Sequence, residues 1–297
     1  MKVIDFSDVH YSYKQGSDVL RGISFSLEAG EVVGLLGKNG AGKTTLMRLA
    51  MGMMVTSQGS VQLFGLDPRR DALDVKRRVG YVSEDQVLPE FLSVGEIIRL
   101  HRGLFPTWDE GLERRLRERF ALSPKAKIKT LSKGQARQVA LLCAVAHRPE
   151  VLLLDEPAGG LDPSARREFL ETSIRLLNEA GTTILFSSHY MSDVERMAGR
   201  IAMIHEGRLL IDNSLDDLRE KYSLALVPRG SGDRQNQLLG LKECLSVRDQ
   251  ADAIHAIFRC EPERCRSILE KGLDIHNSFC TPIALEDMFI ELVGGRS

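Results

Sequence analysis

The spacing of hydrophobic residues predicts short strands near the start of the chain, followed by a strand-and-helix alternation. Residues 3–13 and 23–27 alternate apolar and polar positions, which is typical of half-buried antiparallel strands. Residues 31–37 are apolar on both faces and end in glycine, and residues 44–51 then follow with helical spacing. A buried strand, a glycine-rich turn and a helix in this order predict the opening of an α/β sheet.

A second alternation of the same kind lies late in the chain. It predicts a strand at residues 151–154 and an amphipathic helix at residues 165–180. A second strand at residues 182–187 and a helix at residues 191–197 follow. Between the two alternations, about residues 93–146 are rich in Arg, Glu and Leu and have helical spacing. We therefore expect an α/β core that is interrupted by an inserted helical lobe.

The pattern changes after Tyr222. Residues 226–237 are polar and contain Pro, Gly and Ser, which predicts a linker or long loop. Strand-like segments follow, together with a helical stretch at residues 261–272 and a final amphipathic one at residues 284–293. We expect a first domain at residues 1–222, with the helical lobe inserted in it at about residues 85–147. A small C-terminal α/β domain is expected at residues 223–297.

Composition limits the classes of protein to consider. The chain has 297 residues, is 43% hydrophobic and carries a net charge of -1, which suits a soluble globular protein and gives no sign of a nucleic-acid partner. No apolar run reaches the roughly 18 residues of a membrane span. Asp5 and Asp8 lie where a signal peptide needs an apolar core. Five widely spaced cysteines indicate reduced thiols. We expect a cytoplasmic protein, which could still be peripheral on the membrane through a membrane-embedded partner.

The stretch GKNGAGKT, at residues 37–44, fits the phosphate-binding pattern G-x-x-x-x-G-K-[ST]. In such a loop, backbone N–H groups surround phosphate oxygens and the following helix directs its positive end at them. Lys43 would reach the β- and γ-phosphates, and the Thr44 hydroxyl would ligate Mg²⁺. A chance match is disfavoured because the stretch lies between a buried strand and a helix. The candidate phosphate-binding residues are Gly37, Lys38, Asn39, Gly40, Ala41, Gly42, Lys43, Thr44 and Thr45.

Two acidic residues close the apolar run of residues 151–154, where burial makes a charge costly. Mg²⁺ takes one or two carboxylates, so Asp155 can hold this cation through a water. Glu156 is expected to point the other way, because side chains alternate along a strand, and to polarise a water for attack on the γ-phosphate. The alternative is an acidic strand cap without a ligand, which is the weaker interpretation beside a phosphate loop.

Taken together, the motifs resemble those of the ATP-binding subunits of ATP-binding cassette (ABC) transporters, over roughly residues 1–219. Besides the phosphate loop and the acidic strand end, the chain has LSKGQ at residues 131–135, where the family has LSGGQ. GGLD ends at Asp162 and SSH ends at His189, as the D-loop and the switch histidine do in the family. Tyr13 occupies the place of the aromatic residue that stacks on adenine, although Tyr11 or Tyr13 could equally be a plain strand residue.

The resemblance implies a P-loop ATPase fold with an antiparallel β lobe, an inserted helical lobe and a C-terminal accessory domain. It implies ATP and Mg²⁺ as cofactors and a head-to-tail dimer, homodimeric or heterodimeric, that encloses two ATP molecules. Asp162 would communicate across the dimer, and His189 would contact the γ-phosphate, unless His189 is a surface histidine. The start of a helix capped by Ser132 would bind the ATP of the second subunit. The residues at that helix start are Ser132, Lys133, Gly134 and Gln135.

Two positions depart from the family pattern. The family has Gln where this chain has Glu84, and a Glu carboxylate can still ligate Mg²⁺ but adds negative charge near the γ-phosphate. Gln86 could substitute only if the loop shifted by two residues. Lys133 replaces a glycine, either as an exposed lysine or as an extra cation near a γ-phosphate in trans that offsets Glu84. Neither change removes the catalytic candidates Glu156 and His189.

The resemblance also indicates a membrane permease as partner. The helical lobe and the loop after Glu84 would receive a cytoplasmic helix of that permease, with Phe91 and Leu92 either exposed for it or packed in the core. A second set, Val94, Ile97 and Leu100, recurs at helical spacing and is expected in the core.

The end of the chain points to the export-type subfamily. The stretch TPIALEDMFIELVGG is similar to the tail of exporter subunits, including those for antibiotics. The same region holds four residues that could suggest zinc, but they lack close C-x-x-C pairing and favour structural thiols. They are Cys260, Cys265, His276 and Cys280.

The expected function is therefore ATP hydrolysis that drives a separate permease through closure of a dimer. The alternatives are a soluble ABC-type ATPase that acts on DNA or ribosomes and a regulatory subunit that scarcely hydrolyses ATP. The first is disfavoured because those relatives carry a long coiled-coil insertion or two cassettes, and this chain has neither.

Overall fold

The computed structural model describes residues 1–13, 16–85, 87–162, 166–167, 169–172, 174, 181–229 and 233–294. Gln86 and much of the helix expected at residues 165–180 lie outside these ranges, although the described residues within 166–174 are helical. The chain divides into two compact units, Met1–Asp212 and Asn213–Ser297. This division precedes the expected boundary after Tyr222.

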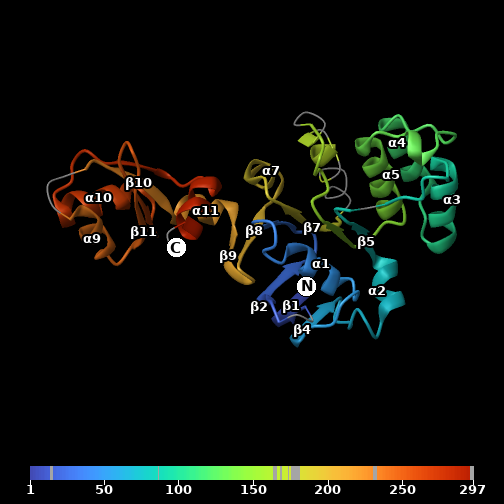
Figure 1. Ribbon diagram of the computed structural model, residues 1–297, viewed down its shortest axis with the longest axis horizontal. Coiled ribbons are helices and arrows are strands. Elements are labelled where there is room, and N and C mark those ends of the chain that lie inside the picture. Colours follow the sequence, from blue (N-terminus) through green and yellow to red (C-terminus); the bar gives the residue numbers. More distant parts are fainter. Residues whose placement is uncertain are drawn as a thin grey trace. The chain divides into compact units, whose positions relative to one another are not determined.

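Three antiparallel strands form the first sheet of unit 1 (Figure 1), in the order β2-β1-β4. The strands are β1 (Lys2–Ser12), β2 (Asp18–Glu28) and β4 (Gln58–Leu63). Alternation in β1 buries Ile4 and Phe6, and the Phe6 ring stacks on Phe25 of β2 with ring centres 4.8 Å apart. The expected half-buried strands are present, and β4, which was not predicted, completes the sheet.

The second sheet has six strands in the order β5-β6-β7-β3-β8-β9. The strands β5, β6, β7, β3 and β8 run parallel to one another. Their side chains are almost wholly buried, which explains their unbroken apolar sequences. In parallel strands the carboxyl ends meet at one edge, so the residues after β3, β6 and β7 are brought together. The bounds are β3 (Val32–Leu36), β5 (Val79–Val82), β6 (Val151–Leu154), β7 (Thr183–Ser188), β8 (Arg200–His205) and β9 (Arg208–Ser214).

Short helices accompany the sheets of unit 1 in its described residues. They are α1 (Lys43–Ala50), α2 (Ala72–Arg78) and α7 (Met191–Met197). Helix α7 packs closely on β3 at Gly34, where a Cβ atom would lie 2.3 Å from Cγ1 of Val194. This close approach requires glycine and fixes the start of α7 next to the end of β7.

The inserted lobe consists of α3 (Val94–Leu104), α4 (Glu110–Arg119), the 3-10 turn η1 (Ile128–Thr130) and α5 (Lys133–Val145). Capping boxes at Ser93 and Ser132 begin α3 and α5. The core face of α3 was predicted wrongly in one position, because Leu100 is 55% exposed and Ile98 is buried beside Val94 and Ile97. Positions i, i+3 and i+4 face inward here, whereas Leu100, at i+6, lies beyond the edge of this buried stripe.

Unit 2 contains an antiparallel sheet in the order β11-β12-β10-β13. The expected linker at residues 226–237 was partly wrong, because its start ends β10 and its last part lies in α9, capped by Asp233. Polar composition concealed these short elements. The elements are α8 (Leu215–Lys221), β10 (Ser223–Val227), α9 (Arg234–Leu239), β11 (Cys244–Asp249), β12 (Ile254–Phe258), α10 (Pro262–Leu273), β13 (Phe279–Pro282) and α11 (Leu285–Gly294).

Three of the four cysteines of unit 2 lie in its hydrophobic core. Cys260, Cys265 and Cys280 are buried, and the sulfur atoms of the last two are 3.6 Å apart. His276 instead pairs with Asp274 at the surface. Within the described ranges, no group of His, Cys, Asp or Glu has the arrangement of a metal site. No described helix has both the length and the apolar character that crossing a membrane requires.

His147 makes the stability of the helical lobe depend on pH. Its side chain is buried and its ring stacks on Phe105, with centres 4.0 Å apart. Burial lowers the pKa of His147 from 6.5 to about 4. Between these values the unfolded chain binds a proton that the folded chain does not, so stability is full above the unfolded pKa and falls as the pH drops towards the folded one.

We therefore predict that wild type loses unfolding free energy between about pH 7 and about pH 4.5. In His147→Leu this loss should be smaller by about 2 kcal/mol. Urea unfolding followed by fluorescence of Trp108 measures this locally, since Thr107 beside it donates a hydrogen bond to the His147 carbonyl at 2.9 Å. His276→Leu is the matched control at an exposed histidine. Equal pH dependence in wild type and His147→Leu would contradict the prediction.

Candidate nucleotide-binding and catalytic site

The loop between β3 and α1 is folded around its glycines. Gly40 and Gly42 have positive φ values of 81° and 109°, which other residues adopt only with strain. The Lys43 side chain bends back over the loop, where its Nζ atom donates to the Gly37 carbonyl at 2.7 Å and to the Lys38 carbonyl at 3.3 Å. The loop therefore holds a buried cation at the beginning of a helix, which is an arrangement suited to phosphate.

A cavity of about 460 Å³ opens beside this loop. Its volume lies in the range of small-molecule sites. Tyr13 is 44% exposed at the cavity, and its hydroxyl lies 3.5 Å from Oγ1 of Thr45. The lining residues are Tyr13, Val19, Asn39, Gly40, Ala41, Gly42, Lys43, Thr44, Thr45, Glu84 and Glu156.

The carboxylate of Glu156 points towards the loop. Its Oε1 atom lies 3.5 Å from Nζ of Lys43, and its Oε2 atom lies 2.9 Å from Nδ1 of His189. Glu156 is 6% exposed, so a cation on one side and an imidazole on the other compensate a charge that water scarcely reaches. The structure thus brings Lys43, Glu156 and His189 together from the ends of three different strands.

The direction of the Glu156 side chain has a different cause from the one expected. Strand β6 ends at Leu154, so alternation along a strand does not set the direction of Glu156. Glu156 has a φ of 44°, in the left-handed region. Hydrogen bonds fix this conformation, because the Glu156 N–H donates to Oγ of Ser187 at 2.7 Å and Arg137 donates to the Glu156 carbonyl at 2.9 Å. A strained turn therefore sets the direction of the Glu156 carboxylate.

Asp155 is fully buried behind the loop. Ser187 donates its hydroxyl to Oδ1 of Asp155 at 2.9 Å, whereas Oδ2 is buried without a hydrogen-bond partner among the described residues. Burial raises the pKa of Asp155, and hydrogen bonds from Ser187 and Thr44 oppose the rise. An unsatisfied carboxylate oxygen beside a threonine hydroxyl is a donor set that fits Mg²⁺.

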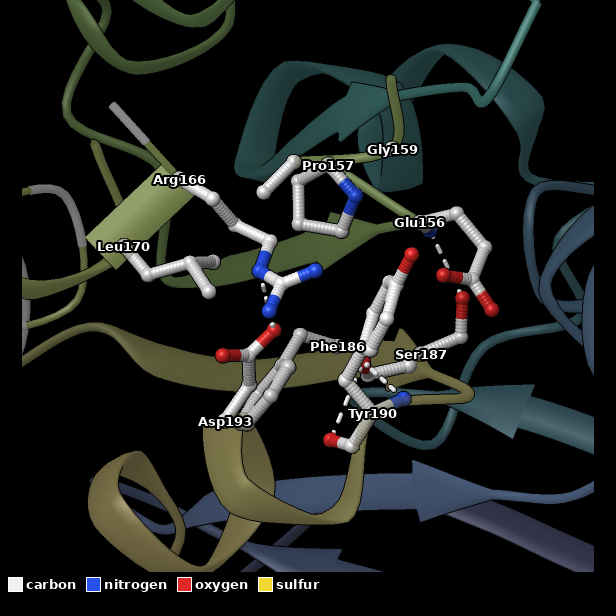
Figure 2. Close-up of a pocket in the computed structure, with 11 residues that line it drawn as sticks. Glu156, Pro157, Gly159, Arg166, Leu170, Phe186, Ser187, Tyr190 and Asp193 are labelled. Carbon is white, nitrogen blue, oxygen red and sulfur yellow. Dashed lines mark hydrogen bonds and ion pairs between the residues drawn. The ribbon is translucent and has the colours of Figure 1, made fainter. Parts of the chain in front are cut away.

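Sequence reasoning missed Ser187 and Arg137 as site residues. Ser187 contacts both acids from the end of β7, as Figure 2 shows for Glu156. Arg137 of α5 also donates to the Glu84 carbonyl at 3.2 Å, so it joins two loops of the site. The Ser-Ser pair before His189 was a usable signal for Ser187, but nothing in a helical pattern distinguishes Arg137 from a surface arginine.

Glu84 is exposed and lines the cavity. The helix start of α5 and Asp162 do not line this cavity within the described part of the chain. At that helix start, Ser132 and Gln135 form a capping box. Lys133 is exposed, and a Cβ atom on Gly134 would lie 3.2 Å from Cδ2 of Leu161. These residues form a separate surface of the same unit.

Comparisons with known proteins agree with this geometry. A family model described as ABC transporter matches residues 20–159. The chain is 30% identical to the uncharacterized ABC transporter ATP-binding protein YdbJ of Bacillus subtilis, over 92% of this chain and 90% of that protein. It is 26% identical to the bacitracin transport ATP-binding protein BcrA of Bacillus licheniformis, with 92% of each chain covered.

A solved structure described as the ATP binding subunit of an ABC transporter superposes with a TM-score of 0.66 and 30% identity, over 73% of this chain and 92% of that one. The expected α/β ATPase fold is thereby confirmed. The chain belongs to the ATP-binding subunits of ABC transporters, which bind and hydrolyse ATP.

Proposed function

We propose that ATP hydrolysis in this chain drives export by a separate membrane permease, through closure of a dimer of ATP-binding subunits. The observation that carries the proposal is that Glu156 contacts both Lys43 and His189 at the edge of the cavity, which Lys43 and Glu156 line. Asp155 is fully buried beside Glu156. The relative BcrA, whose name assigns it to bacitracin transport, supports a role in transport. The exporter-like stretch at the end of the chain supports the direction.

In this proposal the γ-phosphate of ATP enters between the glycine loop and Glu156. Lys43 then exchanges its contact with the Glu156 carboxylate for phosphate oxygens. The freed carboxylate accepts a proton from the attacking water, and His189 holds the γ-phosphate and that water in position. The distances of 3.5 Å to Lys43 and 2.9 Å to His189 support these roles, because both partners already lie within reach of one carboxylate.

We propose that Thr44, Asp155 and Glu84 hold Mg²⁺. The unsatisfied Oδ2 atom of Asp155 and the interaction of the Asp155 carboxylate with Thr44 support the first two ligands. Glu84 lines the same cavity with an exposed carboxylate. When bound, the cation would neutralise phosphate charge.

The surface at the start of α5 is proposed to meet ATP bound to a second subunit, identical or related. Ser132 and Gly134 would offer hydrogen-bond donors, and Lys133 would add a cation that offsets the charge of Glu84. Asp162 would carry contacts across the dimer. Exposed donors at a capped helix start support this role.

The permease would dock on the helical lobe. Val87 and Phe91 are 84% and 74% exposed in the segment that leads from Glu84 to α3. Large apolar side chains at such exposure are typical of a surface that a partner covers. The subunit is accordingly proposed to lie on the cytoplasmic face of the membrane through this partner.

We predict that Glu156→Gln lowers kcat for ATP by roughly two to three orders of magnitude, because the amide cannot accept the proton of water. ATP affinity should remain within about threefold, since Gln keeps the shape of the side chain. Steady-state ATPase assays and fluorescent-nucleotide titration measure the two effects. Glu150→Gln is the control, at an acid paired with Arg78 on the surface. Unchanged turnover in Glu156→Gln would sink the assignment of the base and favour a subunit that scarcely hydrolyses ATP.

For the adenine site, we predict that Tyr13→Ala weakens ATP binding by roughly tenfold, as expected for loss of a ring that stacks on a base. Tyr13→Phe should bind ATP within about twofold of wild type, because the ring is retained and the contact with Thr45 is long, at 3.5 Å. Titration of both variants with ATP measures the effect. Full affinity in Tyr13→Ala would show that Tyr13 is a strand residue only.

A further inference from the structure

A compact cluster of side chains lies close to Glu156 (Figure 2). Nε of Arg166 lies 3.3 Å from Oδ2 of Asp193, and the two side chains are only 15% and 13% exposed. The guanidinium carbon of Arg166 also lies 3.6 Å from the centre of the Tyr190 ring. The guanidinium side of this cation–π contact is shielded from water, whereas Tyr190 is 40% exposed. We call Arg166, Tyr190 and Asp193 the arginine–tyrosine clamp.

The clamp contacts the catalytic candidate His189 through Tyr190. The Tyr190 ring lies 4.0 Å from the His189 ring, with a tilt of 40°, and Nδ1 of His189 contacts Glu156 at 2.9 Å. The backbone of Tyr190 is also fixed, because its N–H donates to Oγ of Ser188 at 3.0 Å. A rigid Tyr190 therefore limits the positions that His189 can occupy.

The other end of the clamp reaches the D-loop. The Arg166 N–H donates to the carbonyl of Asp162 at 2.9 Å. Contacts consequently run from the backbone of Asp162 through Arg166 and Tyr190 to His189. Movement of Asp162 when a second subunit binds would be transmitted to His189 along this path.

The cluster is not a ligand site. The cavity beside it has about 10 Å³ of free volume, at the lower limit for one water. Its walls include Glu156, Phe186 and Ser187 as well as the clamp. Tight packing of this kind restrains side chains rather than admitting a substrate.

We propose that Arg166 and Tyr190 are positioning residues that hold His189 in register with Glu156, with Asp193 as the counter-ion that keeps Arg166 in place. The proposal rests on the function proposed above for His189. Charge balance supports it, because burial raises the pKa of Asp193 and Arg166 opposes that rise. Without Arg166, the Asp193 carboxylate would be buried without this partner and the Tyr190 ring would lose the contact on its face.

The test compares Arg166→Gln and Tyr190→Leu with Tyr190→Phe in the full chain. We expect the first two to lower kcat for ATP by roughly tenfold with ATP affinity within about twofold, because neither residue lines the nucleotide cavity. Tyr190→Phe should keep kcat within about twofold, since the ring supplies both contacts. The double variant Arg166→Gln/Tyr190→Leu should be no slower than the slower single variant, because both act through His189.

A matched control lies on α7, the helix that contains Asp193. Arg196→Gln removes an exposed ion pair with Glu171 and should leave kcat unchanged. If Arg166→Gln folds poorly because Asp193 is left buried, Arg166→Met/Asp193→Asn removes both charges and should show the same kcat loss. Histidine NMR adds a direct readout, with the His189 ring signals expected to shift in Tyr190→Leu and not in Arg196→Gln.

Wild-type kcat in Arg166→Gln and Tyr190→Leu would overturn the clamp while leaving the proposed function intact, provided that Glu156→Gln is inactive. Parallel losses of kcat and ATP affinity, or an equal loss in Tyr190→Phe, would also overturn it, since they would indicate a structural role only. If Glu156→Gln itself is fully active, the proposed function fails and the clamp fails with it.

Discussion

The site depends on two carboxylates that the fold places side by side and removes from water. Asp155 and Glu156 are 0% and 6% exposed, and neither could remain charged there without compensation. Lys43 and His189 compensate Glu156, and Ser187 donates to Asp155. One oxygen of Asp155 remains without a partner among the described residues, which is the property that a cation would satisfy.

The architecture follows from that requirement. A parallel sheet brings the ends of β3, β6 and β7 to one edge, and each end contributes one part of the site. Those parts are a cation from the glycine loop after β3, the acids after β6, and Ser187 with His189 at the end of β7. The left-handed backbone conformation at Glu156 is strained. Arg137 of the helical lobe stabilises this conformation by donating a hydrogen bond to the Glu156 carbonyl. The lobe is therefore bonded to the residue that we propose as the base.

Much of the α/β core was predictable because its strands and turns have strong local signals. The apolar run of β6 and the glycines before Lys43 predicted both the sheet and the location of the nucleotide loop. Short polar elements such as α9 were not predictable, since a cap at Asp233 and a few helical residues do not differ in composition from a loop. Leu100 was misplaced because a three-residue spacing fits more than one face of a helix.

Within the site, residue types at fixed motif positions were predictable, whereas tertiary hydrogen bonds were not. Arg137 reaches Glu156 across 19 positions, and Arg166 reaches Tyr190 from a different element, so no local pattern marks either contact. The direction of the Glu156 side chain depends on the positive φ value of Glu156 itself, which the alternation of side chains along a strand does not predict.

The most direct measurement is a crystal structure of the wild-type chain with Mg²⁺ and a non-hydrolysable ATP analogue. The account predicts that Nζ of Lys43 leaves Glu156, from which it now lies 3.5 Å, and contacts phosphate oxygens, while the cation lies beside Asp155 and Thr44. A triphosphate bound elsewhere, or one bound with the contact between Lys43 and Glu156 intact and no cation near Asp155, would contradict it.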